Sequence, residues 1–314
     1  MPWSTPVPVY IWLSVLIVLS IVMWYRQPRS RVAVLVLSLV FFGVNLIPFF
    51  IINWAVANYY LRYLCLAVPL VVLVRWLLRM RHMPWMPAKK TGSMVVFLIS
   101  LILVPPLAWA NGRVLASTRF QVEEPAPLLV LVPFYGMWTV VNGGNGLDGL
   151  GMSNYVNPFF SPDGYSDPSM AYGVDFMELT IRGNLSPQGA RPDDFRVYEG
   201  FNSEIFAPCQ GTVVFVESGN PPYEVDEPAE GLGDRVVLQC FEVYVTVANL
   251  QNIMVKENDY VRVGQTLGYL GNTGSPSLPH VHVHATAGSY GPDGIPVPLL
   301  FEYKFVARNH VFIR

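Results

Sequence analysis

The sequence predicts an α-helical membrane region of about four helices over residues 1–112, followed by an all-β, antiparallel domain over residues 140–314. The 314 residues are 52% hydrophobic and only 13% charged, which is too apolar for one ordinary soluble domain. Residues 1–112 contain nine Lys or Arg and no Asp or Glu, so all 22 acidic residues follow them. The second part consists of short β-branched runs bounded by turn residues, a pattern typical of strands.

Four apolar stretches in the first part are long enough to cross a bilayer, which takes about 20 mostly apolar residues. They lie near residues 7–25, 32–54, 55–74 and 91–110. The third stretch contains Arg62 and Pro69, so spanning requires that the arginine snorkels and that neighbouring helices accommodate the proline. We interpret Arg62 as an interfacial anchor and the helices as a membrane anchor without a transport role, and a partner-binding face on the helices is the alternative.

The positive charges predict the orientation of this anchor. One basic loop follows the first stretch and a second follows the third, whereas the turn at residues 53–58 is uncharged. Short loops rich in Lys and Arg stay in the cytoplasm, so the N-terminus and the C-terminal domain are expected outside, in a periplasm or on the cell surface. The first stretch lacks the basic leader and cleavage site of a signal peptide. The basic loop residues are Arg26, Arg29, Arg31, Arg75, Arg79, Arg81, Lys89 and Lys90.

The second part begins with residues 113–139, which we interpret as a linker because the run from Glu123 to Pro127 breaks regular structure. Residues 140–167 are rich in Gly, Asn, Pro and aromatic residues and are expected to form loops. The expected strands cover residues 172–181, 211–217, 235–239, 242–248, 260–263 and 280–285. Beyond Gly112 there are eleven Lys or Arg against 22 acids, which excludes a nucleic-acid partner for this part.

Cysteine is sparse, with three residues in the chain. Cys209 and Cys240 each border an expected strand in the part placed outside, where a disulfide persists. They pair only if those strands are neighbours at the required distance, and two buried thiols are the alternative. Cys65 lies in an expected helix and is assigned to packing.

Residues 255–285 carry the most chemical information, and two segments upstream of them extend the pattern. The ordered blocks are Gly173-Val174-Asp175-Phe176, Ala207-Pro208-Cys209-Gln210-Gly211-Thr212-Val213-Val214, Val261-Arg262-Val263-Gly264-Gln265-Thr266-Leu267-Gly268, Gly271-Asn272-Thr273-Gly274 and Pro279-His280-Val281-His282. In this order, over roughly residues 170–305, they resemble the lysostaphin-type, or LytM-domain, peptidoglycan metallopeptidases. The β domain is therefore expected to have a LytM-like antiparallel fold.

Three alternating histidines follow the glycine-rich turn. Alternate residues of a strand point to the same face, so His280, His282 and His284 are expected on one face. Imidazoles at this spacing suit zinc or another late first-row metal. The alternative is a set of surface or hydrogen-bonded histidines.

The resemblance implies a zinc site with specific ligands. In the family, zinc is held by an upstream histidine, by the aspartate matched by Asp175 and by the histidine matched by His282. The histidine matched by His280, and another in a central Ala-His-Leu segment, perform acid–base or oxyanion work. Here Asn249 replaces the central histidine, and no histidine between Arg113 and His280 supplies the upstream ligand.

These two losses affect both the metal and the chemistry. A catalytic zinc needs three protein ligands, and an amide such as Asn249 is no general base near neutral pH. Zinc is therefore expected to bind weakly or not at all unless another residue completes the site. The candidates are His284, which the strand spacing places far along unless the strand bulges, and Glu178, Glu199 and Glu204.

These features predict a membrane-anchored, outward-facing LytM-like domain that is non-catalytic and binds cell-wall peptide or an envelope protein. The strands around Asp175, Asn249 and His282 are expected to converge on one groove. Two alternatives are an active zinc endopeptidase that cuts peptidoglycan cross-links with a rearranged ligand set, and a structural subunit of a membrane complex.

Overall fold

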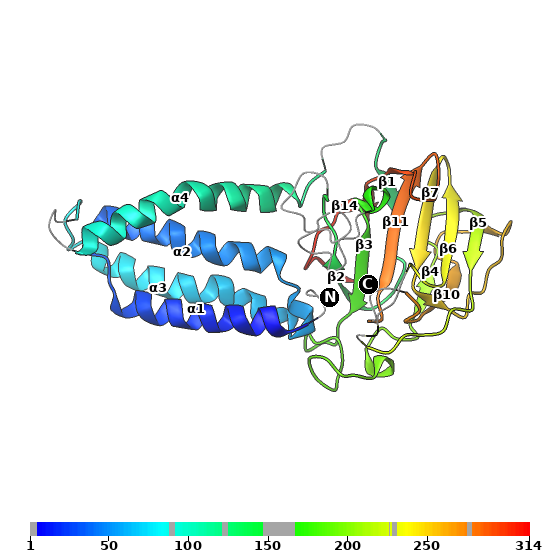
Figure 1. Ribbon diagram of the computed structural model, residues 1–314, viewed down its shortest axis with the longest axis horizontal. Helices are drawn as coiled ribbons and strands as arrows, with labels where there is room; N and C mark the ends of the chain where they lie inside the picture. The colour runs from blue at the N-terminus through cyan, green and yellow to red at the C-terminus, as the bar shows by residue number, and fades with distance from the viewer. Residues whose placement is uncertain are drawn as a thin grey trace.

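A computed structural model shows a bundle of four long helices beside a β domain (Figure 1). It describes residues 5–87, 92–120, 125–146, 167–225, 227, 231–274 and 278–314. The helices are α1 (Val7–Tyr25), α2 (Arg31–Ile51), α3 (Leu64–Met80) and α4 (Gly92–Ala116). Together with the strands described below, they confirm the predicted fold class of apolar helices followed by antiparallel β structure.

Four segments of the described chain are long and apolar enough to cross a membrane. They are Val7–Tyr25, Arg31–Ile51, Tyr59–Met80 and Met94–Ala116. The third combines α3 with the preceding 3-10 helix η3 (Tyr59–Tyr63), and Pro69 is accommodated inside α3. Each span is therefore a nearly continuous helix, the form in which a backbone can satisfy its own polar groups in lipid.

The bounds of three predicted stretches need correction, and the fourth is the simplest case because α4 continues to Ala116, beyond the predicted end at residue 110. α2 ends at Ile51, and a short 3-10 helix η2 (Trp54–Val56) separates it from the third span, which begins at Tyr59 and not at residue 55. The Asn58 side chain accepts a hydrogen bond from the Tyr60 backbone N–H at 3.0 Å, which caps the new helix start. Three arginines assigned to loops by the sequence lie in helices: Arg75 and Arg79 in α3, and Arg31 as the first residue of α2. The Arg75 guanidinium lies 4.0 Å from the Trp24 ring.

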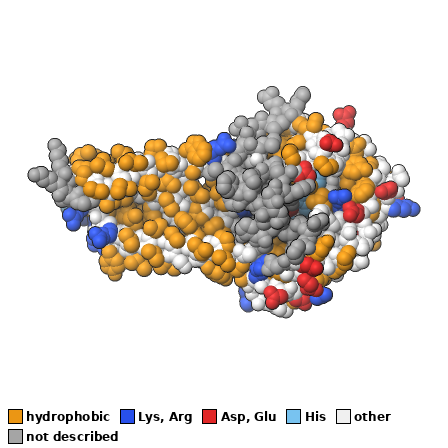
Figure 2. Space-filling view, in the orientation of Figure 1, with side chains coloured by type: hydrophobic (Ala, Val, Ile, Leu, Met, Phe, Trp, Pro, Cys, Tyr) orange, Lys and Arg blue, Asp and Glu red, His pale blue; other side chains and the backbone are white. Residues whose placement is uncertain are grey.

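The two basic loops meet at one end of the bundle. The Arg31 guanidinium donates to the Met83 carbonyl at 3.1 Å, and Arg79 donates to the Gln27 side chain. Figure 2 shows Lys and Arg side chains at the end of the bundle away from the β domain, and acidic side chains over the β domain. At the opposite end, Val9 of α1 packs in one cluster with β-domain residues. The acidic residues therefore belong to the β domain, in keeping with their absence from residues 1–112.

The β domain contains one large sheet and two small ones. The nine-stranded sheet has the order β15-β2-β3-β11-β7-β6-β5-β9, with β12 paired to β11, and the small sheets have the orders β1-β13-β14 and β4-β10-β8. Every pairing is antiparallel except β1 with β13. The strands of the large sheet are β2 (Met137–Asn142), β3 (Val174–Glu178), β5 (Gly211–Glu217), β6 (Arg235–Cys240), β7 (Val243–Ala248), β9 (Tyr260–Val261), β11 (Val281–Ala287), β12 (Ile295–Pro296) and β15 (Val311–Ile313). Those of the small sheets are β1 (Leu128–Val130), β4 (Glu204–Phe206), β8 (Leu250–Gln251), β10 (Thr266–Leu270), β13 (Leu299–Phe301) and β14 (Lys304–Phe305).

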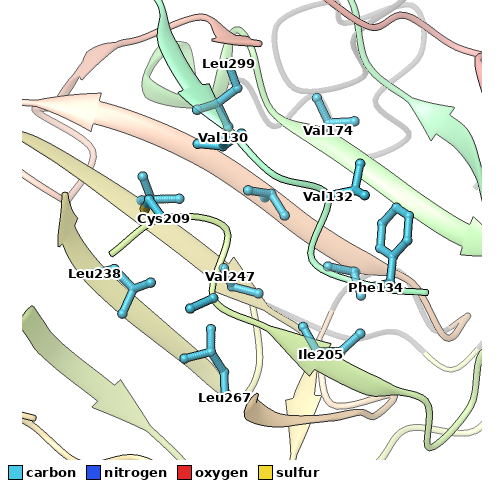
Figure 3. Packing of buried hydrophobic residues seen from close by; sticks show 14 of the residues in the cluster. Val130, Val132, Phe134, Val174, Ile205, Cys209, Leu238, Val247, Leu267 and Leu299 are labelled. Carbon is cyan, nitrogen blue, oxygen red and sulfur yellow. The ribbon is translucent and has the colours of Figure 1, made fainter. Parts of the chain in front are cut away.

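The hydrophobic core lies between the large sheet and the two small sheets. Val174 and Val247 from the large sheet pack with Val130 and Leu299 of one small sheet and Ile205 of the other (Figure 3). Because side chains alternate along a strand, the same strands present a second face on the opposite side. That second face carries the histidines.

Residues 113–139, interpreted as a linker, contain the end of α4, β1 and the beginning of β2. Val140–Asn142, from the segment expected to form loops, completes β2, while residues 147–166 of that segment lie outside the described residues. The strand β1 was missed because its partner is β13, so Leu128 pairs with Leu299 across much of the chain. β5 has the bounds that the sequence predicted.

Cys209 and Cys240 form a disulfide with an S–S distance of 1.98 Å and a Cα–Cα distance of 6.2 Å. Of the alternatives left open by the sequence, the bridge is the one present. It joins the segment before β5 to the end of β6. Cys65 is a buried free cysteine, in keeping with its assignment to packing.

Asn309 and Arg308 join the β domain to the end of the bundle that faces it. The Asn309 side chain donates to the carbonyls of Phe50 and Ile52 at 3.0 and 2.9 Å, and Arg308 donates to the Ile51 carbonyl at 2.6 Å. The last carbonyls of a helix lack partners within that helix. Here residues of the β domain supply the donors.

Arg62 belongs to the same junction. Its guanidinium donates to the Asn309 carbonyl at 2.7 Å and lies 4.1 Å from the centre of the Phe49 ring. The residue is only 6% exposed. The sequence predicted an arginine that snorkels to water, but a buried carbonyl and an aromatic face take the place of water, so Arg62 anchors the β domain to the helices.

Candidate functional site

The site predicted from the sequence forms a buried polar cluster on the face of the large sheet opposite the core. Asp175 lies on β3 and is paired in register with His282 of β11, and His282 in turn is paired with Ala248 of β7. Asn249 follows β7, and His280 immediately precedes β11. The five side chains belong to residues that are between 0 and 3% exposed: Asp175, Asn249, His280, His282 and His284.

Asp175, His282 and His284 form a hydrogen-bonded row. The His282 Nδ1 atom lies 2.8 Å from Asp175 Oδ1, and its Nε2 atom lies 2.7 Å from His284 Nδ1. An ionised carboxylate only accepts hydrogen bonds, so His282 donates from Nδ1 to Asp175. The Asn142 amide donates to the second carboxylate oxygen of Asp175 at 2.9 Å.

The charges in this row follow from its burial and partners. Burial by itself raises the pKa of Asp175, but His280, His282 and the hydrogen bond from Asn142 outweigh it and lower that pKa. Burial, and then the charge of His282, lower the pKa of His284 well below its ordinary value. The row therefore holds an ionised aspartate at one end and a neutral imidazole at the other.

His280 and Asn249 form a second pair. His280 Nδ1 lies 2.7 Å from the Leu278 carbonyl, and Asn249 Nδ2 lies 2.7 Å from His280 Nε2. A carbonyl only accepts, so Nδ1 carries the proton and the lone pair of Nε2 accepts from Asn249. Burial lowers the pKa of His280, and the charge of Asp175 only partly offsets this, so the imidazole is neutral. Both of its ring nitrogens are engaged in hydrogen bonds.

The position of Asn249 depends on its backbone and on Gly274. Asn249 has a positive φ of 64°, a conformation that asparagine tolerates better than most residues. A Cβ atom on Gly274 would lie 2.0 Å from Asn249 Oδ1 and 2.7 Å from the Leu232 carbonyl carbon. Only glycine fits there, and the local chain holds the Asn249 amide against His280.

The donor set does not fit a catalytic zinc. Within the described residues, no group of three or more His, Cys, Asp or Glu is arranged to hold a metal ion. Asp175 lies at the Nδ1 edge of His282, whereas His284 lies at the Nε2 edge of the same ring. His284 contacts His282 at 2.7 Å, but from this edge it cannot join Asp175 and His282 Nδ1 on one ion. Only two of the three ligands that zinc requires are therefore supplied.

The three glutamates considered as replacements lie elsewhere. Glu178 is on β3, three residues from Asp175, so it lies on the opposite face of the strand, where it accepts from Ser203 at 2.9 Å. Glu199 lies near enough to raise the pKa of Glu178 through its charge. Glu204 is on β4 of a small sheet, where it accepts from Thr266.

Sequence reasoning missed two residues near Asp175. Asn142, a hydrogen-bond donor to Asp175, lay in the segment expected to form loops. Arg308 is buried, which lowers its pKa to about 10, while the negative charge of Asp175 acts in the opposite direction. No motif marks either residue. Asn142 reaches Asp175 through the pairing of β2 with β3, and Arg308 lies in the segment before β15, which pairs with β2.

A family model matches the part of the chain that contains most of this cluster. Residues 194–291 match the model of peptidase family M23, and they include Asn249 and the three clustered histidines, whereas Asp175 lies upstream of the match. Residues 194–291 are therefore similar to an M23, or LytM-type, peptidase domain, as the sequence blocks indicated.

Parts of the chain are also similar to individual known proteins. The peptidoglycan DD-endopeptidase ShyA of Vibrio cholerae is 34% identical over 112 residues, which cover 35% of this chain and 25% of ShyA. Among solved structures, the lysostaphin catalytic domain of Staphylococcus simulans is 24% identical, covering 40% of this chain and 74% of that one, with a TM-score of 0.28. The EnpA catalytic domain of Enterococcus faecalis is 19% identical, covering 58% and 94%, with a TM-score of 0.29. The chain thus spans about a quarter of the curated relative that it matches.

Proposed function

We propose that this protein is an integral membrane protein whose M23-type domain lies outside the cytoplasm, does not hydrolyse peptidoglycan, and binds cell-wall peptide. Four apolar segments act as the anchor in this proposal. The alternative is that the same domain binds an envelope protein.

The outward orientation is supported by the separation of charge along the bundle. The basic loops lie together at the end away from the β domain, and short basic loops stay in the cytoplasm. Single cysteines near Thr5 and at exposed positions of the β domain are expected to react with an impermeant thiol reagent in intact cells. A cysteine near Lys89 is expected to stay unlabelled, and its labelling would reverse the orientation.

The absence of hydrolysis is supported by one observation above all. Each ring nitrogen of His280 and His282 is engaged by a neighbouring protein atom at 2.7 to 2.8 Å. A zinc peptidase needs a held metal, an open position for water and a group that accepts the proton of that water. In the proposed state, the Asn249 amide donates a hydrogen bond to the lone pair of His280 Nε2. His284 is hydrogen-bonded to His282 and does not act as a third metal ligand.

The ligand class is proposed from ShyA, to which 112 residues of the chain are 34% identical. ShyA is a peptidoglycan DD-endopeptidase, so the substrate of that protein is the peptide part of the cell wall. Binding of an extended peptide depends on shape and backbone hydrogen bonds more than on a metal. Loss of the zinc ligands therefore leaves peptide recognition intact in this proposal.

The test combines metal content, hydrolysis and binding in the full-length protein purified in detergent. We expect far less than about one zinc per chain after incubation with zinc, because the ligand set is incomplete. No peptide fragments should be released from purified cell wall, and the double variant His280→Ala, His282→Ala should behave the same. Zinc-dependent release that disappears in the double variant would establish an active enzyme.

Binding is measured by cosedimentation with insoluble cell wall. Wild-type protein should sediment with it, and free stem peptides should compete, whereas peptide-free glycan should not. Protein that stays in the supernatant would exclude the cell-wall ligand and leave an envelope protein as the occupant.

A further inference from the structure

The turn that follows β3 is fastened to the beginning of the third span. The carbonyls of residues 181–183 accept hydrogen bonds from three successive residues at that helix start: Tyr60 Oη to residue 181 at 3.3 Å, Asn58 Nδ2 to residue 182 at 2.8 Å and the Tyr59 N–H to residue 183 at 2.8 Å. The Asn58 amide also donates to Asn184 Oδ1 at 2.8 Å. These hydrogen bonds therefore hold the turn at a fixed position along the axis of the third segment, beside its first residues.

Gly183 makes this approach close. It has a φ of +81°, and a Cβ atom there would lie 2.7 Å from the ring of Tyr60. The turn is closed by hydrogen bonds from the Gly183 N–H to the Thr180 carbonyl and from the Thr180 N–H to the Asn184 carbonyl, both 2.8 Å. Only glycine satisfies both the conformation and the contact.

The tip of this turn presents an apolar side chain and a positive charge. Ile181 is 88% exposed, and the neighbouring Arg182 is exposed without a side-chain hydrogen bond or ion pair to any residue that the structure describes. Tyr60 and Tyr63, at the start of the span, are 45% and 48% exposed beside it. Single exposed apolar residues are common, but this one lies at the level where a segment fit to cross a membrane begins.

We propose that the turn of residues 180–184 contacts the lipid bilayer, with Ile181 entering the boundary between headgroups and acyl chains and Arg182 pairing with a lipid phosphate. The bilayer is favoured over a protein partner because the turn continues the exposed apolar surface of the spans. Tyrosines gather at such boundaries, and cationic side chains are attracted to anionic headgroups. This inference rests on the membrane anchoring proposed above, and it gives the β domain a lipid contact of its own.

The experiment measures the depth of Ile181 in vesicles. Full-length Cys65→Ala protein carrying Ile181→Cys is labelled with the environment-sensitive fluorophore NBD and reconstituted into phosphatidylcholine–phosphatidylglycerol vesicles. Lipids with a spin-label quencher near the headgroup should reduce its fluorescence by roughly twofold, because interfacial side chains lie only ~5–10 Å deep.

Two labelled positions serve as controls. Ile102→Cys lies in α4, inside a candidate span, and Phe241→Cys lies at the exposed turn between β6 and β7, on strands farther from the bundle (Figure 1). The label at Ile102 should be quenched by lipids that carry the spin label deeper in the acyl chain. The label at Phe241 should not be quenched by either kind of lipid. This pattern, with quenching at Ile181, supports the proposal.

Three other patterns overturn it. Quenching at Ile102 but not at Ile181 shows that the helices span while the turn stays in water. Equal quenching at Ile181 and Phe241 shows that the whole domain lies on lipid without a specific contact. No quenching at either Ile102 or Ile181 removes the lipid contact together with the membrane anchor.

Discussion

The two faces of β11 differ in how their side chains are held. Val281, Val283 and Ala285 point into the core between the sheets, where apolar neighbours surround them on all sides. On the opposite face, His282 and His284 are equally buried, yet each is held by a few directed hydrogen bonds. One strand therefore carries a face that tolerates any well-packed apolar set and a face that depends on individual atoms.

The difference extends to the two carboxylates of β3. Asp175 lies among hydrogen-bond donors, whereas Glu178 lies on the opposite face beside apolar groups and Glu199. The pKa of Asp175 is lowered, while burial, opposed by the hydrogen bond from Ser203, raises the pKa of Glu178 to about 7. Three residues along one strand are enough to reverse the electrostatic environment.

The largest effect is expected on the core face. Phe176→Ala removes a fully buried ring that lies 5.1 Å from the ring centres of both Phe134 and Phe301. It should destabilise the β domain by about 3–5 kcal/mol, because it leaves a cavity among aromatic neighbours. Thermal unfolding of the full-length protein in detergent measures this loss. The exposed residue Tyr303, changed to alanine, is the control, and a Phe176→Ala melting temperature equal to that of the control would contradict the prediction.

The next effect is expected beside the histidine face. Gly274→Ala places a methyl group against Asn249 Oδ1 and the Leu232 backbone. We expect a loss of roughly 2–3 kcal/mol, since backbone atoms cannot move aside as a side chain can. Gly291→Ala, where the nearest atom is 3.7 Å away, provides the matched control in the same melting experiment. Similar melting temperatures for the two variants would mean that Gly274 is not closely packed.

A smaller effect should distinguish a hydrogen-bonding partner from a metal ligand. His284→Ala leaves His282 Nε2 without its 2.7 Å partner, which should cost roughly 1–2 kcal/mol because a buried polar atom becomes unsatisfied. Its zinc content, measured by elemental analysis, should equal that of wild-type protein. A zinc content that falls in this variant alone would identify His284 as a ligand and would place a metal site on the histidine face of β11.

The smallest effect concerns pH. Because the folded-state pKa of Glu178 is about 7, above its ordinary 4.5, protonation favours folding. The contribution of Glu178 to stability should be greatest at pH values below its ordinary pKa of 4.5. It should be lost as the pH rises through the folded-state pKa of about 7. Glu178→Gln removes this dependence, so the melting temperature of the variant relative to wild type should increase between about pH 5 and about pH 8. A constant difference over that range would show that Glu178 is not perturbed.

Local pattern was sufficient to predict the core face and part of the site. The alternation of Val281, His282, Val283 and His284 fixed which residues share a face, and β5 was predicted with its observed bounds. The blocks around Asp175 and His282 also resembled peptidase family M23, whose model matches residues 194–291. These features depend on residues that are close together in sequence or on ordered motifs.

The remaining features depend on partners that are far apart in the chain. β1 exists because it pairs with β13, and the start of the third span depends on contacts with β-domain residues. The orientation of the His282 ring decides whether His282 and His284 could hold one metal ion together. That orientation is set by the hydrogen bond to Asp175 and not by the spacing of residues along the strand. A single sequence contains no signal for such pairings.

The junction at Asn309 has a consequence for how the protein is made. The carbonyl of Ile52 receives its hydrogen bond from a residue 257 positions later in the chain. At a synthesis rate of about 5–20 residues per second, roughly ten to fifty seconds separate the emergence of these two partners from the ribosome. During that interval α2 has already been made while its C-terminal end lacks this donor, and Arg62 lacks the Asn309 carbonyl. Water or a chaperone must satisfy those groups until the β domain has folded, so assembly of the end of the bundle that faces the β domain is completed after synthesis of both parts.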